Sequence, residues 1–119
     1  MNYASRFAKL AADAKSRVRE VSPKEASKQQ AQGAVLIDVR ESEEFAQGHA
    51  QGAIHLSKGL LELRIEEAIP DPATPIICYC GGGSRSALAA DNLQKMGYTN
   101  VASMAGGLKA WKNEGLAIS

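Results

Sequence analysis

A cysteine followed directly by three glycines is the stretch of this sequence best suited to chemistry. Cys80 follows an apolar run, and Gly81, Gly82 and Gly83 come directly after it. Where side chains are absent, successive backbone N–H groups can converge on one point and bind an anion. A thiolate is such an anion, and donors of this kind lower a cysteine pKa from its ordinary value of about 8.5. The pattern predicts that Cys80 is a nucleophile; the alternative interpretation is a structural cysteine before a glycine turn.

The residues on either side of Cys80 predict the junction between a strand and a helix. Residues 76–79 are apolar and begin with two isoleucines, which is typical of a strand buried on both faces. The run from Ser84 to Met96 is rich in Ala, and Gly97 predicts its end. Cys80 is therefore expected near a helix N-terminus, where unpaired N–H groups favour an anion. Ligands of open α/β sheets bind at this edge of the sheet.

Strands and helices alternate along the rest of the chain. Expected strands include residues 34–37, 53–56 and those near 101, and expected helices cover residues 23–32, 42–47, 59–68 and 108–113. Ser22 and Ser42 are expected to be the N-caps of the first two of these helices. This alternation predicts an α/β fold, with a mostly parallel five-stranded sheet and helices on both of its faces. Trp111 is interpreted as core filling, because a small domain gains most by burying its one large ring.

Residues 1–19 have a pattern of their own. Apolar side chains recur at helical spacing, among them Tyr3, Phe7 and Leu10. We expect an N-terminal helical extension that lies against a single domain over residues 20–119. The basic residues of this segment also resemble those of a transit peptide, and a helix that docks on a partner is a third interpretation.

Composition limits the classes of function. The chain has 119 residues, of which 45% are hydrophobic, and its net charge is +1. This length suits one domain with a modest core. The balanced charge gives no reason to expect nucleic acid as a partner. No apolar run approaches the ~20 residues of a membrane helix, so no membrane association is expected.

The cysteines and histidines suggest neither disulfides nor a metal site. Cys78 and Cys80 do not make a disulfide framework, so we expect a reducing, cytoplasmic compartment. Cys78 lies inside the expected strand and is interpreted as a small core residue. His49 and His55 lack the spacing of a zinc site and are interpreted as structural. We expect no metal and no cofactor.

Two charged residues follow the strand expected at residues 34–37. Asp38 lies at its end and is predicted to accept backbone N–H groups, which would fix the next loop. Arg40 has two interpretations: it pairs with Glu43 or Glu44, or it faces the active site.

Three blocks of the sequence, taken in order, resemble the signatures of one family. They are Asp38, Val39, Arg40 and Glu44 with residues 48–53; residues 80–85, which have the pattern Cys-x-x-Gly-x-Arg; and residues 106–111. Together they resemble the rhodanese family over nearly the whole chain. One departure is Ala50 and Gln51, where the family usually has a bulky aliphatic residue and then proline.

The resemblance implies a rhodanese-like domain over residues 20–119 and the activity of a sulfurtransferase. Such an enzyme moves sulfane sulfur from thiosulfate or a persulfide donor to a thiol or cyanide acceptor, through a persulfide on a cysteine that matches Cys80. The residues implied to bind substrate are Gly81, Gly82, Gly83, Ser84, Arg85 and Arg40. In rhodanese-like chains the helix expected at residues 59–68 approaches the mouth of the site, so Arg64 is a further candidate, with an ion pair to Glu67 as its alternative. We expect a monomer.

Two alternative functions follow from the length and composition of the loop. Cysteine phosphatases and arsenate reductases that resemble rhodanese have one more residue between Cys and Arg, so that their loop surrounds a tetrahedral anion. Only four residues separate Cys80 from Arg85, which favours sulfur transfer. A persulfide carrier with little thiosulfate turnover is the second alternative, because Gly81 and Gly82 stand where many thiosulfate enzymes have basic or polar side chains.

Overall fold

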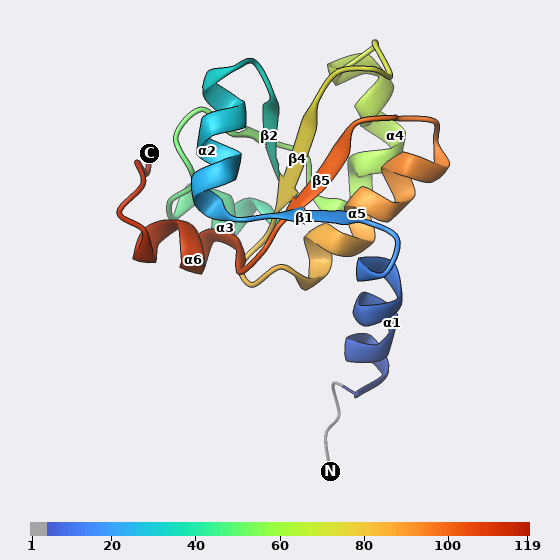
Figure 1. The fold of residues 1–119 in the computed structure, drawn as a ribbon, viewed down its shortest axis with the longest axis horizontal. Coiled ribbons are helices and arrows are strands. Elements are labelled where there is room, and N and C mark those ends of the chain that lie inside the picture. The colour runs from blue at the N-terminus through green and yellow to red at the C-terminus, as the bar shows by residue number, and fades with distance from the viewer. Residues whose placement is uncertain (1–4) are drawn as a thin grey trace.

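The fold is described by a computed structural model of residues 5–119 (Figure 1). The strands are β1 (Arg19–Val21), β2 (Val35–Asp38), β3 (Ile54–His55), β4 (Ile76–Tyr79) and β5 (Val101–Met104). The helices are α1 (Ser5–Lys15), α2 (Pro23–Ala31), α3 (Ser42–Ala46), α4 (Lys58–Ala68), α5 (Ser84–Lys95) and α6 (Gly107–Asn113). The five strands form one sheet in the order β1-β5-β4-β2-β3, and each pairing of neighbouring strands is parallel. The predicted fold class is confirmed, with a sheet that is parallel throughout.

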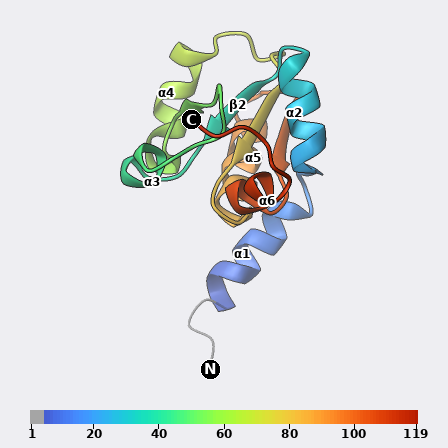
Figure 2. The same cartoon turned by 90° about the vertical axis from the view of Figure 1, so that its left-hand side faces the viewer.

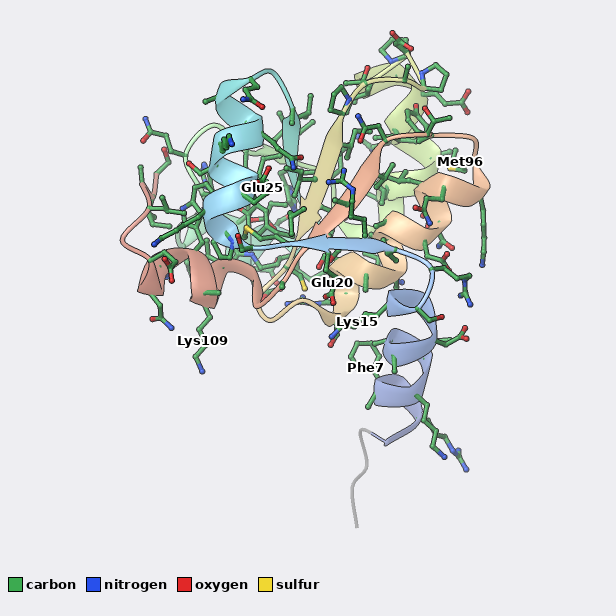
Figure 3. The ribbon with its side chains drawn as sticks, viewed as in Figure 1. Phe7, Lys15, Glu20, Glu25, Met96 and Lys109 are labelled. Carbon is green, nitrogen blue, oxygen red and sulfur yellow. The ribbon has the colours of Figure 1, made fainter. Side chains whose placement is uncertain are left out.

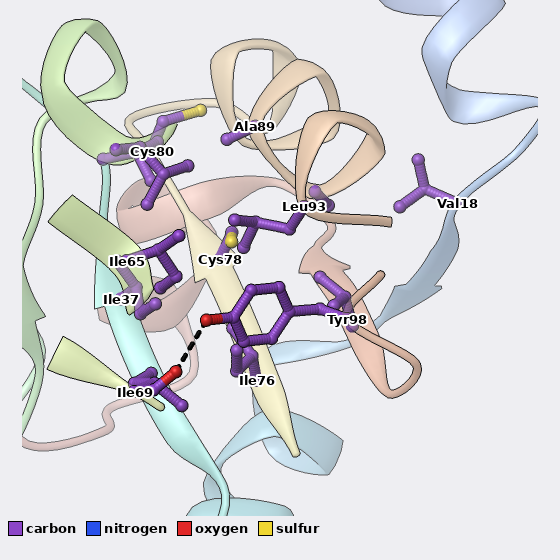
Figure 4. Close-up of a cluster of buried hydrophobic side chains, with 14 residues drawn as sticks. Val18, Ile37, Ile65, Ile69, Ile76, Cys78, Cys80, Ala89, Leu93 and Tyr98 are labelled. Carbon is purple, nitrogen blue, oxygen red and sulfur yellow. Dashed lines mark hydrogen bonds between the residues drawn. The ribbon is translucent and has the colours of Figure 1, made fainter. Parts of the chain in front are cut away.

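Helices cover both faces of the sheet, as the period-two pattern of β4 requires. Ile76 and Cys78 point into a core beneath α4 and α5, which contribute Ile65 and Leu93 (Figure 4). Ile77 and Tyr79 point to the other face.

The second core lies beneath α2 and α6 (Figure 2). It contains Ala26 from α2 and Leu108 and Trp111 from α6, together with Ile77 and Tyr79. Trp111 is 2% exposed, which confirms its interpretation as a core residue. β4 therefore lies in the middle of the sheet and packs on both sides, so its carboxyl end is held rigidly.

Helix boundaries follow the expected signals, with one correction. Ser22 caps α2, since its Oγ accepts a hydrogen bond from the backbone N–H of Glu25 at 3.1 Å. The N-cap of α3 is Glu41, whereas the sequence predicted Ser42. The backbone N–H of Glu41 donates to Oε1 of Glu44 at 3.1 Å, so a glutamate side chain stabilises this helix start.

The N-terminal end of helix α1 projects from the domain (Figures 1 and 2). The helix also contacts α5. Ala11 and Ala14 are buried against the domain, and Arg17, which follows the helix, donates to both carboxylate oxygens of Asp91 at 3.2 and 2.8 Å. Figure 3 shows Phe7 on this helix, and its side chain is 44% exposed. The part of the predicted extension that includes Tyr3, residues 1–4, lies outside the described residues. That residues 20–119 form a domain separate from this extension stays a prediction.

Among residues 5–119, no helix combines the length and the apolar character that crossing a membrane requires.

Candidate active site

Cys80 follows the last residue of β4 and is 1% exposed. Its Sγ accepts hydrogen bonds from the backbone N–H groups of Gly83 at 3.1 Å and Ser86 at 3.4 Å. The hydroxyl of Ser86 lies 3.5 Å from the same sulfur. Several donors therefore converge on one sulfur atom, in the arrangement that the glycine run predicted.

The donors around Cys80 outweigh the effect of its burial. Burial alone would raise the pKa of the thiol, because a charged group loses hydration there. Hydrogen bonds from the hydroxyl and N–H of Ser86, and from the N–H groups of Gly83 and Gly82, oppose this and lower the pKa of Cys80 below its ordinary value. The site thus favours a thiolate in a place that admits little water.

Cys78 shows what burial does to a thiol that lacks such donors. It lies two residues earlier on β4, is 0% exposed and packs among the side chains beneath α4 and α5 (Figure 4). Burial, with a smaller contribution from the neighbouring Cys80, raises the pKa of Cys78 to about 12. The two cysteines are both free. Their difference in pKa comes from the loop and not from the strand.

Backbone N–H groups at the N-terminus of α6 bind the carbonyl groups of the Cys80 loop. The N–H of Leu108 donates to the carbonyl of Cys80 at 2.8 Å, and the N–H of Lys109 donates to the carbonyl of Gly81 at 3.3 Å. These bonds use helix-terminal N–H groups that have no partner within α6. Because the loop carbonyls face α6, the loop N–H groups are left to face Sγ. Lys109 itself points its side chain outward (Figure 3).

Gly107 makes this close approach between α6 and the loop achievable. Its φ is +57°, and a Cβ at this position would lie 2.6 Å from the carbonyl carbon and oxygen of Gly81 and closer still to the carbonyl oxygen of Cys80. Gly83, the N-cap of α5, also has a positive φ of 107°. Gly82 is exposed and Gly81 and Ser84 are half-buried, so these three residues form the outer surface of the loop.

Arg85 closes the loop through an ion pair. Its guanidinium donates to both carboxylate oxygens of Glu44 on α3, at 2.8 and 3.1 Å. Arg85 holds the pKa of Glu44 at about 2, and Glu44 in turn raises the pKa of Arg85. This bidentate pair joins the loop to α3 and neutralises the cation of the Cys-x-x-Gly-x-Arg pattern.

Arg40 is buried in a pair with Asp38, so of its two interpretations the pairing with Glu43 or Glu44 is wrong, and a role facing the active site stays a prediction. Its Nη2 donates to Asp38 at 2.8 Å and to the carbonyl of Gly48 at 2.7 Å, and its side chain is only 8% exposed. Asp38 also accepts the backbone N–H of Arg40 at 2.9 Å, which confirms that this carboxylate fixes the loop after β2.

Among the contacts described for residues 5–119, none joins Arg64 to the loop of residues 80–85, and its role in anion binding stays a prediction. Its exposed side chain lines two surface pockets, one with Leu56 and Glu67 and one with Ser42 and His55, and no residue of the run 80–85 lines either of them. Among the described residues, no ion pair joins Arg64 to Glu67, so its expected structural partner is not engaged either.

The two histidines flank one aromatic ring. Phe45 stacks on His49 with centroids 3.8 Å apart and on His55 with centroids 4.7 Å apart. This confirms their interpretation as structural residues that support α3. Within residues 5–119, no group of three or more His, Cys, Asp or Glu side chains is arranged to hold a metal ion.

Sequence reasoning missed four residues that shape this site. Glu44 is expected only as part of the family resemblance and as a partner of Arg40, not of Arg85. Gly107 is part of the resemblance, which assigns it no mechanical role. Ser86 lies in the expected helix start with no role of its own, and no pattern in the sequence indicates Ser103 on β5, whose Oγ lies 2.8 Å from Oγ of Ser86. Ser86 alone had a local signal, since it lies at the helix N-terminus that faces Cys80.

A sequence model of the family described as Rhodanese-like domain matches residues 22–114. A protein of Pseudomonas entomophila named thiosulfate sulfurtransferase GlpE is 37% identical over 98 residues, which are 82% of this chain and 88% of that protein.

Two solved structures extend the comparison to α1. The 30 kDa polysulfide-sulfur transferase homodimer of Wolinella succinogenes superimposes with a TM-score of 0.82 at 30% identity, covering 99% of this chain and 90% of that one. A protein of Rhodopseudomonas palustris, described as of unknown function and a possible tyrosine phosphatase, gives 0.85 at 29% identity, covering 100% and 98%.

The contact between Gly107 and the loop predicts a large loss of stability in Gly107→Ala. Gly115→Ala is the matched control, because its φ is also positive, at +74°, while nothing lies within 4 Å of the added Cβ. The control should lose about 1 kcal/mol of unfolding free energy from backbone strain. Gly107→Ala should lose roughly 3 kcal/mol, because the methyl group also displaces the loop carbonyls. Urea unfolding measures both values, and equal losses would contradict the close approach.

The Glu44–Arg85 pair predicts a dependence of stability on pH. The folded-state pKa of Glu44 is about 2, below its ordinary 4.5, so the pair stabilises the fold above pH 4.5 and this contribution is lost between about pH 5 and 2. Glu44→Gln should therefore be less stable than the parent at pH 7, and the difference should shrink as the pH falls toward 2. Urea unfolding at several pH values tests this. Glu43→Gln, an exposed neighbour on α3, should show no such change.

Proposed function

This chain belongs to the rhodanese-like domain family, and we propose that it moves sulfane sulfur from thiosulfate or a persulfide donor to a thiol or cyanide acceptor through a persulfide on Cys80. Its relatives named thiosulfate sulfurtransferase make it a rhodanese-type sulfurtransferase. The observation that carries the persulfide step is the set of N–H groups of Gly83 and Ser86 that donate to Sγ of Cys80. They favour an anionic sulfur in a buried site.

Loading is a displacement at sulfur. The Cys80 thiolate attacks the outer sulfur of thiosulfate, a new S–S bond forms, and the old S–S bond breaks. Sulfite leaves with the electron pair of that bond. The product is a persulfide whose negative charge lies on the outer sulfur, and the backbone N–H groups of the glycine loop can stabilise that charge.

In unloading, Sγ of Cys80 is the leaving group, whereas in loading it is the nucleophile. An acceptor thiolate or cyanide attacks the outer sulfur, and Sγ of Cys80 leaves with the electron pair as a thiolate. The same donors that held the resting thiolate receive this charge, so one loop serves both halves of a ping-pong cycle. No cofactor is required for either step as written.

The charge of the loop supports a second candidate, a persulfide carrier with little thiosulfate turnover. Arg85, the cation of the loop, is paired with Glu44, and Arg40 is paired with Asp38, so a carboxylate neutralises the charge of each of these two candidate anion-binding residues. Thiosulfate carries two negative charges, and a neutral loop attracts it weakly. Single-turnover rates of loading from thiosulfate and from a low-molecular-weight persulfide would separate the two candidates. A carrier loads from the persulfide and barely from thiosulfate.

A phosphatase is the weaker alternative. The loop between Cys80 and Arg85 presents N–H groups to one sulfur atom, and the shorter run does not leave the width that a phosphoryl group needs. We therefore expect sulfurtransferase activity without measurable hydrolysis of a generic aryl phosphate. Faster hydrolysis of an aryl phosphate than sulfur uptake from any donor would reverse this assignment.

The compartment that we propose for the protein follows from its free thiols. Cys78 and Cys80 are unbridged, which suits a reducing compartment such as the cytoplasm. We keep the proposal of a monomer, while the W. succinogenes neighbour is described as a homodimer. Light scattering on the full chain decides between these assemblies.

The persulfide proposal predicts different outcomes for the two cysteines. Intact mass after incubation with a sulfur donor should show one added sulfur on the parent protein and on Cys78→Ser, and none on Cys80→Ser. The reason is that Cys78 is 0% exposed and its pKa is raised to about 12 by burial, so it stays a thiol. Sulfur transfer to cyanide should be lost in Cys80→Ser and largely retained in Cys78→Ser. A folded Cys78→Ser that fails as completely as Cys80→Ser would contradict the assignment.

A further inference from the structure

We propose that Ser103 on β5 is a positioning residue for sulfur transfer: it orients the hydroxyl of Ser86 toward Sγ of Cys80, and it thereby assists the departure of that sulfur during unloading. The first half of this proposal concerns the thiolate alone. The second half rests on the proposed persulfide cycle.

Three side chains from three elements form a continuous hydrogen-bonded chain. Oγ of Ser103 on β5 lies 2.8 Å from Oγ of Ser86 on α5, which lies 3.5 Å from Sγ of Cys80 at the end of β4. Ser86 and Ser103 are 0% exposed and Cys80 is 1% exposed. Ser103 is therefore a buried polar side chain on a central strand, and its position is explained by the partner that it has on α5.

The number of hydrogens on each group determines the direction of donation in these hydrogen bonds. A thiolate only accepts, so when Cys80 is ionised the hydroxyl of Ser86 donates its one hydrogen to Sγ. Oγ of Ser86 is then free to accept, and the hydroxyl of Ser103 donates to it. In residues 5–119 Ser86 is the only hydrogen-bond partner found for the side chain of Ser103. Ionisation of Cys80 thus aligns both hydroxyls, and the second bond strengthens the first.

Removing Ser103 frees Ser86 to turn away. Ser86 lies in the first turn of α5, and a helical serine can donate to the backbone carbonyl three or four residues earlier, which here belongs to Gly83 or Gly82. With Ser103 in place, the oxygen of Ser86 has a fixed acceptor role that favours the rotamer facing Sγ. The loss of Ser103 should therefore weaken the bond from Ser86 to the thiolate without removing any group that touches the sulfur.

The two half-reactions should respond differently. A thiol with a lower pKa is a better leaving group but a weaker nucleophile, so changes in pKa act in opposite directions on departure and attack. In the persulfide the charge lies on the outer sulfur, and it returns to Sγ only as the acceptor takes that sulfur. Ser103→Ala should consequently slow unloading about twofold and leave loading unchanged or slightly faster.

The direct test is the rate of iodoacetamide alkylation of Cys80 as a function of pH. Cys78 does not interfere, since it is buried and its pKa is about 12. Ser86→Ala should raise the apparent pKa of Cys80 by about 1, and Ser103→Ala by about 0.5. The double variant should match Ser86→Ala, because Ser103 acts only through Ser86. Additive shifts would show that Ser103 acts by another route, which would overturn the proposal.

A second pair of variants separates the loss of the Ser103 hydroxyl from a change in packing. Ser103→Thr and Ser103→Val have the same shape, and only the first keeps a hydroxyl. The proposal expects the threonine variant to have the lower apparent pKa of the two, by about 0.5, and the faster unloading. Equal pKa values in this pair, or in the parent and Ser103→Ala, would refute it.

These readouts keep the two proposals distinguishable. The alkylation profile depends only on the thiolate, so a protein that transfers no sulfur could still show the Ser103 effect, and the proposed function alone would fail. A protein that forms the persulfide while Ser103→Ala shows parent-like alkylation and unloading would retain its function, and the Ser103 proposal alone would fail.

Discussion

The site depends on one constraint, which is that a buried sulfur can carry charge only if enough donors replace its lost water. Cys80 and Cys78 lie two residues apart and are equally removed from solvent, yet their pKa values shift in opposite directions. The difference lies in the N–H groups of Gly83 and Ser86 and in the Ser86 hydroxyl, all directed at one sulfur. We propose that these donors are what make Cys80 reactive.

The rest of the fold keeps the donors in place. β4 is packed between two cores, so the strand from which the loop starts is supported on both faces. The N-terminus of α6 binds the loop carbonyls of Cys80 and Gly81, which turns the loop N–H groups toward Sγ. Glu44 on α3 fixes Arg85 at the far end of the loop. The loop itself is rich in glycine and has little stiffness, so its shape is imposed by β4, which precedes it, and by α3 and α6, which are distant from it in the sequence.

The sequence predicted what depends on local pattern and missed what depends on tertiary contact. The alternation of strands and helices, the place of Cys80 at the end of β4 and the cap at Ser22 follow from short-range rules, and they are confirmed. The pairing of Arg40 was wrong because its true partner, Asp38, is brought under the guanidinium by the bend that Asp38 itself creates. The contacts Glu44–Arg85 and Ser86–Ser103 join residues 41 and 17 positions apart, and no local pattern reports them.

The central claim is that the loop stabilises an anionic sulfur in a buried site. The most direct measurement is the ultraviolet absorbance of the Cys80 thiolate as a function of pH, taken as the difference between the parent protein and Cys80→Ser. We expect an apparent pKa clearly below the ordinary value of about 8.5. An apparent pKa at or above that value would mean that burial outweighs the donors, and it would contradict the account.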